Sequence, residues 1–248
     1  MPQKRFSFTL VFAVLLSAFF YSCAKEDVSE PTNQLLKPDG KTPYKTVTIG
    51  GKVWLAENYE AVTDMDGKSI PLAKDITSWK DSAVKKSPAR CYYNNDSATY
   101  SRYGLLYNGY ALENLAPKGW HVPTKVEFEN LVTAIKNGRT DTLMPAKEIS
   151  NMLRIARKEP AAGKDPLLYW GGNTNTDTDK TDSTGFAAFP AGWINTTSAF
   201  AGSTSGTRFW TSTTDGTSDL YFFSVDLNGY TADFGGKNAG YSVRLVKN

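Results

Sequence analysis

Between residues 103 and 128 the chain passes from an aromatic segment, through a rigid turn, into a helix that carries its own start signal. The aromatic segment is Tyr103–Tyr110, and the turn lies within Pro117–Thr124. Thr124 can cap a helix, and Glu127, three residues later, completes a capping box. An apolar stripe follows at helical spacing: Phe128, Leu131, Val132 and Ile135. The pattern therefore predicts an α-helix that starts at Thr124 and stops at Gly138.

Strand signals dominate the rest of the chain. Alternating segments at 45–49 and 52–56 flank Gly50-Gly51, and segments at 220–227 and 230–234 flank Asn228-Gly229, so each pair predicts a hairpin. Further strands are expected at 186–189, 192–194, 207–212 and 241–246, and a second helix at 145–157. Residues 62–88 show mainly turn signals. The sequence thus predicts one β-rich α+β domain with two helices, spanning residues 44–248.

The order of these motifs resembles a known family. A strand ending in Trp-x-Ala-Glu-Asn at 54–58, the aromatic segment, and the turn at 117–124 are together similar to the signature of the Fibrobacter succinogenes major paralogous domain family, a group of bacterial extracytoplasmic modules. The helix start at 122–129 and the final Gly240–Arg244 also resemble the wider C-type-lectin-like and formylglycine-generating-enzyme-like fold group. The resemblance implies a C-type-lectin-like mixed architecture. In that group the long loop before the last strands commonly carries the ligand.

The N-terminus has the pattern of a bacterial lipoprotein signal peptide. Lys4 and Arg5 precede fifteen residues without a charge, Phe6–Phe20, which suits a signal-peptide core, whereas a bilayer-spanning helix needs roughly 20. Ser22-Cys23 then resembles a lipobox, in which the cysteine is acylated and metabolic palmitate would label it. We therefore expect a lipoprotein signal peptide at 1–22 and lipid attachment at Cys23. The alternative is a simple secretory signal that is cleaved nearby.

A polar segment at 23–43, rich in turn-forming residues, is expected to be a flexible tether. Its Lys25-Glu26-Asp27 resembles the surface-export signal of lipoproteins in the Bacteroidota. We therefore expect the protein at the bacterial outer membrane, lipid-anchored and exposed at the cell surface. Removal of residues 1–22 lowers the formal net charge from +3 to +1, and no basic block is present. Nucleic acid is therefore not an expected partner.

Only one cysteine, Cys91, remains after Cys23, so no internal disulfide is expected. Cys91 is either a reactive or intermolecular thiol, or a small buried apolar residue between aromatic neighbours. Relatives in the family commonly carry a cysteine before the Pro-Lys-Gly-Trp-His motif and another in the final strand. This chain has Ala116 and Leu245 there. The resemblance therefore implies the loss of one disulfide bridge.

The residues that could support catalysis are few. His121 is the single histidine, which excludes a site with several histidine ligands, and we interpret it as structural. The late cysteines that hold copper in formylglycine-generating enzymes are absent, as is a Gly-x-Ser-x-Gly elbow. We therefore expect a non-catalytic binding module for a glycan or a protein ligand. The alternative is a carboxylate-dependent extracellular hydrolase acting on polysaccharide.

A long polar loop follows Trp170 and is the predicted ligand site. Its candidate binding residues are Asn173, Asn175, Asp177 and Asp179, with Trp170 or Trp193 offering an aromatic face to a sugar. The alternative is that both tryptophans belong to the core and the loop is merely solvated. Oxygen side chains suit calcium, but Thr181 and Asp182 break the EF-hand spacing, so no cofactor is expected.

Overall fold

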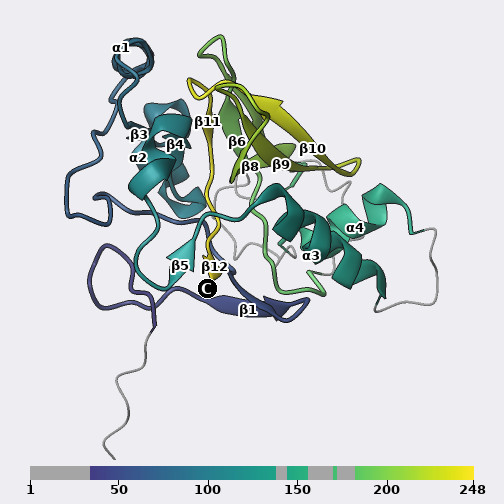
Figure 1. Ribbon diagram of the computed structural model, residues 1–248. Helices are drawn as coiled ribbons and strands as arrows, with labels where there is room; N and C mark the ends of the chain where they lie inside the picture. Colours follow the sequence, from purple (N-terminus) through teal and green to yellow (C-terminus); the bar gives the residue numbers. More distant parts are fainter. Residues whose placement is uncertain (1–33, 138–143, 156–169, 172–181) are drawn as a thin grey trace, which may run out of the picture. The chain divides into compact units, whose positions relative to one another are not determined.

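The computed structural model describes residues 34–137, 144–155, 170–171 and 182–248. These residues form two mainly antiparallel sheets and several short helices (Figure 1). The smaller sheet has the strand order β1 (Thr46–Ile49), β2 (Lys52–Leu55), β12 (Val246–Lys247) and β5 (Trp120–His121). The larger sheet has the order β10 (Tyr230–Gly235), β9 (Leu220–Asp226), β8 (Gly206–Thr214), β6 (Ala191–Ile194), β11 (Gly240–Tyr241), β4 (Leu106–Asn108) and β3 (Arg90–Cys91), and β7 (Phe200–Ser203) pairs with β6.

The helices are α1 (Ile76–Val84), α2 (Ser97–Tyr100), α3 (Lys125–Asn137) and α4 (Ala146–Leu153), with short 3-10 turns at η1 (Tyr93–Asn95), η2 (Ser101–Tyr103) and η3 (Gly109–Asn114). The predicted β-rich α+β class is therefore confirmed. Residues 34–248 form one compact unit. No helix within the described ranges is long and apolar enough to cross a membrane.

Both predicted hairpins are present. Gly50 and Gly51 connect β1 to β2 with φ values of 59° and 76°, the left-handed conformation that a two-residue hairpin turn requires. At the β9–β10 turn, the Asp226 carboxylate accepts hydrogen bonds from the N–H groups of Asn228 at 2.7 Å and Gly229 at 2.9 Å. Local residue chemistry is therefore sufficient to fix these two turns.

Helix α3 begins where the capping box predicts, and its apolar stripe is buried against strands of both sheets. The rings of Phe128 and Phe223 stack with their centroids 4.7 Å apart, which fixes the helix over β9. The second predicted helix is shorter than expected, because α4 ends at Leu153 and Arg154 has extended backbone angles. Gly138 and residues 156–157 lie outside the described residues.

The sequence predicted two helices, whereas the described residues contain four α-helices, and one predicted strand is absent. Residues 62–88 contain a helix, α1, which Asp75 caps by accepting the Ser78 N–H at 2.7 Å and which buries Trp79. Residues 186–189, predicted as a strand, form only an isolated bridge to Arg154, and Ala187 has a φ of 52°. The reason lies far away in sequence, since the buried Arg244 binds the carbonyl oxygens of this segment.

The predicted closing strand at 241–246 instead links the two sheets. It leaves the larger sheet after β11 and enters the smaller sheet as β12, seen as the yellow segment running down to the C-terminus in Figure 1. All six of its residues are buried, so the expected alternation of buried and exposed positions is absent. Tyr241, Val243 and Leu245 pack into an apolar cluster on one side, whereas Ser242 and Arg244 make buried hydrogen bonds on the other.

The last part of the expected tether is folded. Lys37 Nζ lies 3.1 Å from Glu57 Oε1, Leu36 bridges to Pro43, and the Tyr44 N–H donates to the Leu35 carbonyl at 2.8 Å. The expected tether is therefore folded at least from Gln34, ten residues before the domain start expected from the sequence. Residues 23–33 lie outside the described part of the chain.

Candidate functional site

The two tryptophans expected to offer a sugar platform lie in different environments. Trp170 is fully buried, donates from Nε1 to the Ala188 carbonyl at 2.9 Å, and packs under the Arg154 guanidinium. This burial favours the core alternative for Trp170. Trp193 is half-buried, with its ring against Gly202 and the Arg208 guanidinium 4.2 Å from the ring centroid. The structure places the two rings in separate clusters and does not bring them together.

The remaining sequence-predicted ligand residues are Asn173, Asn175, Asp177 and Asp179, and these lie outside the described residues, as does Cys23. Their proposed roles stay predictions. Where the chain is described again, at Asp182, it lines a cleft beside β1.

Cys91 is fully buried, and this burial raises the pKa of its thiol well above the ordinary value. A buried thiol with a raised pKa is a poor nucleophile, so the small-apolar-residue alternative for Cys91 is confirmed. Ala116 and Leu245, where the family carries cysteines, pack into one apolar cluster. This common packing agrees with an apolar replacement of a lost bridge.

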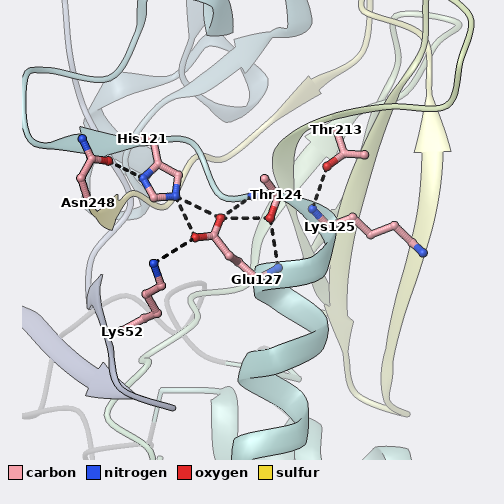
Figure 2. Close-up of polar contacts among 7 residues, drawn as sticks. All are labelled: Lys52, His121, Thr124, Lys125, Glu127, Thr213 and Asn248. Carbon is pink, nitrogen blue, oxygen red and sulfur yellow. Dashed lines mark hydrogen bonds and ion pairs between the residues drawn. The ribbon is translucent and has the colours of Figure 1, made fainter.

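His121 and Glu127 lie at the centre of a polar network at the start of α3 (Figure 2). Glu127 Oε2 accepts the Thr124 N–H at 2.8 Å, and Thr124 Oγ1 accepts the Glu127 N–H at 3.1 Å, which is the predicted capping box. His121 Nε2 lies 2.9 Å from Glu127 Oε1, and its Nδ1 lies 2.6 Å from Asn248 Oδ1. Lys52 Nζ is 3.7 Å from Glu127 Oε1. The network joins the helix start to β2, to β5 and to Asn248, the residue that follows β12.

Partial burial alone raises the pKa of the Glu127 carboxyl, but the hydrogen bonds from the Thr124 backbone and from His121 outweigh it and lower the pKa below its ordinary value. Glu127 is therefore held as a carboxylate that accepts from several donors. A group engaged in this way suits a structural role, which agrees with the interpretation of His121 from the sequence.

A larger feature lies elsewhere, in a cleft beside β1. It has a volume of about 930 Å³ and is bounded by the outer side of β1, by Tyr44 and Glu57, by Arg102 next to the aromatic segment, and by the irregular segment at 182–189. Its walls are mainly apolar, with Val47, Ile155 and Phe189 contributing. Clefts of this size with a few convergent polar groups are the usual sites for small ligands.

Four charged residues line this cleft: Lys45, Arg102, Glu57 and Asp182. Burial raises the pKa of Asp182, although the Ala187 N–H and the charge of Arg244 act in the opposite direction. Burial also acts to raise the pKa of Glu57, but hydrogen bonds from the Lys45 N–H and from Lys37 outweigh it, so this pKa is lowered. The cleft therefore combines two cations with two carboxyl groups whose proton affinities are shifted in opposite directions.

Arg244 lies next to this cleft and is fully buried. Its guanidinium donates to the carbonyls of Leu55, Phe186 and Ala187 at 2.7–2.8 Å and to Asn58 Oδ1 at 2.8 Å. Burial lowers the pKa of Arg244 to about 9, although the charges of Glu57 and Asp182 raise it. The two carboxyl groups of the cleft thus partly offset a buried positive charge that has no ion-pair partner among the described residues.

Sequence reasoning missed this cleft because its lining comes from six separate parts of the chain. One local signal was available, since Glu57 belongs to the Trp-x-Ala-Glu-Asn motif and is the only ionisable residue in it. Among the described residues, no group of three or more His, Cys, Asp or Glu side chains is arranged to hold a metal ion.

Comparison with known proteins identifies one family. The model of the Fibrobacter succinogenes major domain matches residues 47–247, which covers both sheets and helices α1–α4. No curated protein and no solved structure matches the chain, so the C-type-lectin-like architecture stays a prediction. With four fifths of its length matched from β1 to β12, the chain belongs to the Fibrobacter succinogenes major domain family.

Proposed function

We propose that this protein is a lipid-anchored, extracytoplasmic binding module, exposed at the cell surface, that recognises a glycan or a protein ligand without catalysing a reaction. The lipid anchor is supported by the uncharged run Phe6–Phe20 and by Ser22-Cys23, and surface exposure by Lys25-Glu26-Asp27. The binding role rests on one observation, the cleft beside β1.

The cleft suits binding for two reasons. Its apolar walls can bury part of a ligand, and its four charged side chains can fix the orientation of that ligand. The carboxyl groups are already engaged, since Glu57 Oε2 accepts the Lys45 N–H at 2.9 Å and Asp182 Oδ1 accepts the Ala187 N–H at 3.0 Å. Groups held by structural hydrogen bonds favour recognition over proton transfer.

The test is a glycan array probed with the full chain in a non-ionic detergent, with and without calcium. Thr46→Trp places a large ring in the cleft without removing any packed side chain, because Thr46 is exposed on β1 and lines the cleft. Thr48→Trp is the matched control, since Thr48 is also exposed, faces the same side of β1 and lies outside the cleft. We expect Thr46→Trp to abolish the binding that Thr48→Trp retains. Equal binding by both variants would exclude the cleft as the ligand site.

A second function has one observation in its favour. The opposite shifts in the pKa values of Glu57 and Asp182 are the pattern that separates an acid from a base in a carboxylate-dependent hydrolase. A panel of polysaccharides, assayed for the release of reducing ends, tests this alternative. Release by the parent chain that is lost in Asp182→Asn would favour the hydrolase, and absence of release would favour binding alone.

A further inference from the structure

Arg208, on β8, is held in an unusual position on the larger sheet. Its guanidinium lies 4.2 Å from the ring centroid of Trp193, 4.6 Å from that of Phe222 and 5.5 Å from that of Tyr241. Aromatic rings of this kind hold a guanidinium in place by cation–π attraction and by stacking. The side chain is therefore fixed in orientation by three rings from three neighbouring strands.

The hydrogen-bonding capacity of Arg208 is nearly unused. Nε is buried without a partner, Nη1 makes one long contact to Tyr241 Oη at 3.4 Å, and no carboxylate in the described ranges forms an ion pair with the group. An arginine has five N–H donors, and four of them are on Nη1 and Nη2, which together make only this one long contact with the described residues. The geometry leaves Arg208 ready to receive an external anion.

Two hydroxyl groups lie in line with Arg208. The strand register places Ser224 of β9 directly opposite Arg208, and Thr231 of β10 directly opposite Ser224. Residues paired in this way point to the same face of a sheet, with neighbouring side chains about 5 Å apart. The row therefore spans about 10 Å, roughly the length of one sugar ring with its substituents. Neither hydroxyl hydrogen-bonds to another residue in the described part of the chain.

An acidic side chain on the same face of the sheet adds a hydrogen-bond acceptor to this row. Asp233 follows Thr231 by two residues on β10, and its Oδ1 accepts the Phe234 N–H at 2.8 Å, which leaves Oδ2 to accept a hydroxyl proton. A simple anion would use only the arginine, and a neutral sugar would use only the hydroxyls and Asp233. A sugar that carries a carboxylate uses both sets.

We propose that Arg208, Ser224 and Thr231 form a binding subsite for a uronic acid unit, with the sugar carboxylate on the Arg208 guanidinium and the ring hydroxyls on Ser224, Thr231 and Asp233. A planar fork of N–H donors matches a carboxylate in two parallel hydrogen bonds. The subsite shares no residue with the cleft beside β1. Its test is therefore independent of the proposed function.

Saturation-transfer NMR on the full chain in non-ionic detergent tests the subsite, with sodium D-glucuronate, D-glucose and sodium acetate as probes at one ionic strength. We expect transfer to the ring protons of glucuronate at millimolar concentration, little transfer to glucose, and weak competition by acetate. Arg208→Gln should weaken glucuronate binding at least tenfold, because it removes a charged, paired contact. Arg208→Lys keeps the charge but loses the fork, so it should give an intermediate loss.

A second variant keeps the test valid if Arg208→Gln lowers the melting temperature. Thr231 is exposed on the edge strand, so Thr231→Val removes a hydroxyl without disturbing the core, and we expect a loss of about threefold. Thr214→Val, at an exposed threonine on β8 outside the row, is its control and should bind as the parent does. Unchanged binding in folded Arg208→Gln or in Thr231→Val would overturn the proposal. Competition by acetate equal to that of glucuronate would also overturn it, because an adventitious anion contact would then explain the result.

Discussion

Replacing Thr124 and Glu127 by alanine, singly and together, tests whether the network in Figure 2 holds the start of α3 or serves another purpose. Thr124→Ala removes the acceptor of the Glu127 N–H, a loss that costs about 1 kcal/mol at a helix N-cap. Glu127→Ala removes the acceptor of the Thr124 N–H, the partner of His121 and a negative charge at the helix N-terminus. The backbone N–H left without an acceptor and the lost interaction with the helix dipole together predict that Glu127→Ala lowers the free energy of unfolding by about 1–2 kcal/mol.

The two losses should not add. Each residue of the box supplies the partner of the other, so the double variant should be more stable than the sum predicts, by about 0.5 kcal/mol or more. Urea titration of all three variants gives these values, and thermal melting should show about 2–4 °C per kcal/mol for a domain of this size. Glu129→Ala is the matched control, because Glu129 lies on the same helix, pairs with Lys125 at 2.8 Å and is 49% exposed. Its loss should cost less than about 0.5 kcal/mol.

The contribution of Glu127 to the stability of the fold should depend on pH in one direction. The pKa of Glu127 is lowered in the folded protein, so its contribution to stability is fully present above the pKa of the unfolded chain and disappears as the pH falls through the folded value. The free-energy difference between the parent and Glu127→Ala should therefore shrink as the pH falls below about 4.5, the ordinary value for a glutamate. A Glu127→Ala variant as stable as Glu129→Ala at pH 7 would refute the structural role and reopen a catalytic one.

Four further predictions use simpler assays. Cys23→Ala should lose metabolic palmitate labelling and leave the membrane fraction, and unchanged labelling would contradict the lipid anchor. Replacing Lys25-Glu26-Asp27 by alanines should protect the domain from protease added to whole cells, whereas equal digestion would count against surface export. Cys91 should stay unreactive towards a thiol reagent until denaturant is added, because it is fully buried; rapid native labelling would show that its environment opens. Arg244→Met should lower the free energy of unfolding by about 3–5 kcal/mol in urea titration, because it leaves three buried carbonyls without a donor, and an unchanged midpoint would mean that these bonds contribute little.

The parts of the fold that the sequence predicted are those decided by neighbouring residues. Gly50-Gly51 can adopt the left-handed turn by themselves, and Thr124 and Glu127 complete a cap within a single helical turn. Helix α1 also has a reciprocal cap, between Asp75 and Ser78, but this Asp-x-x-Ser pattern is less distinctive than Thr-x-x-Glu. The buried Trp79 of α1 donates from Nε1 to the carbonyl of Asn238 at 3.0 Å, a partner 159 residues away. Contacts at that separation stabilise a helix that its own sequence specifies only weakly.

The candidate sites also divide into features that neighbouring residues determine and features that depend on residues far apart in the sequence. The sequence offered Trp193 as a possible aromatic face for a sugar, but it did not point to the neighbouring Arg208, because only the parallel pairing of β6 with β8 brings the two together. The row of Arg208, Ser224 and Thr231 likewise depends on the register of three strands. A pattern of residue types along the chain carries no information on which positions become opposite neighbours in a sheet.

Arg244 connects the fold to the cleft beside β1, and this connection decides which substitutions can report on binding. The guanidinium holds the irregular segment at 186–187 in place, and Glu57 and Asp182 partly offset its buried charge. Neutralising either carboxyl group therefore changes the electrostatic environment of a buried cation as well as the surface that a ligand would meet. A loss of binding in such a variant would not separate recognition from stability. Thr46 makes none of these contacts, so a large residue there blocks the cleft while Arg244 and both carboxyl groups stay as they are.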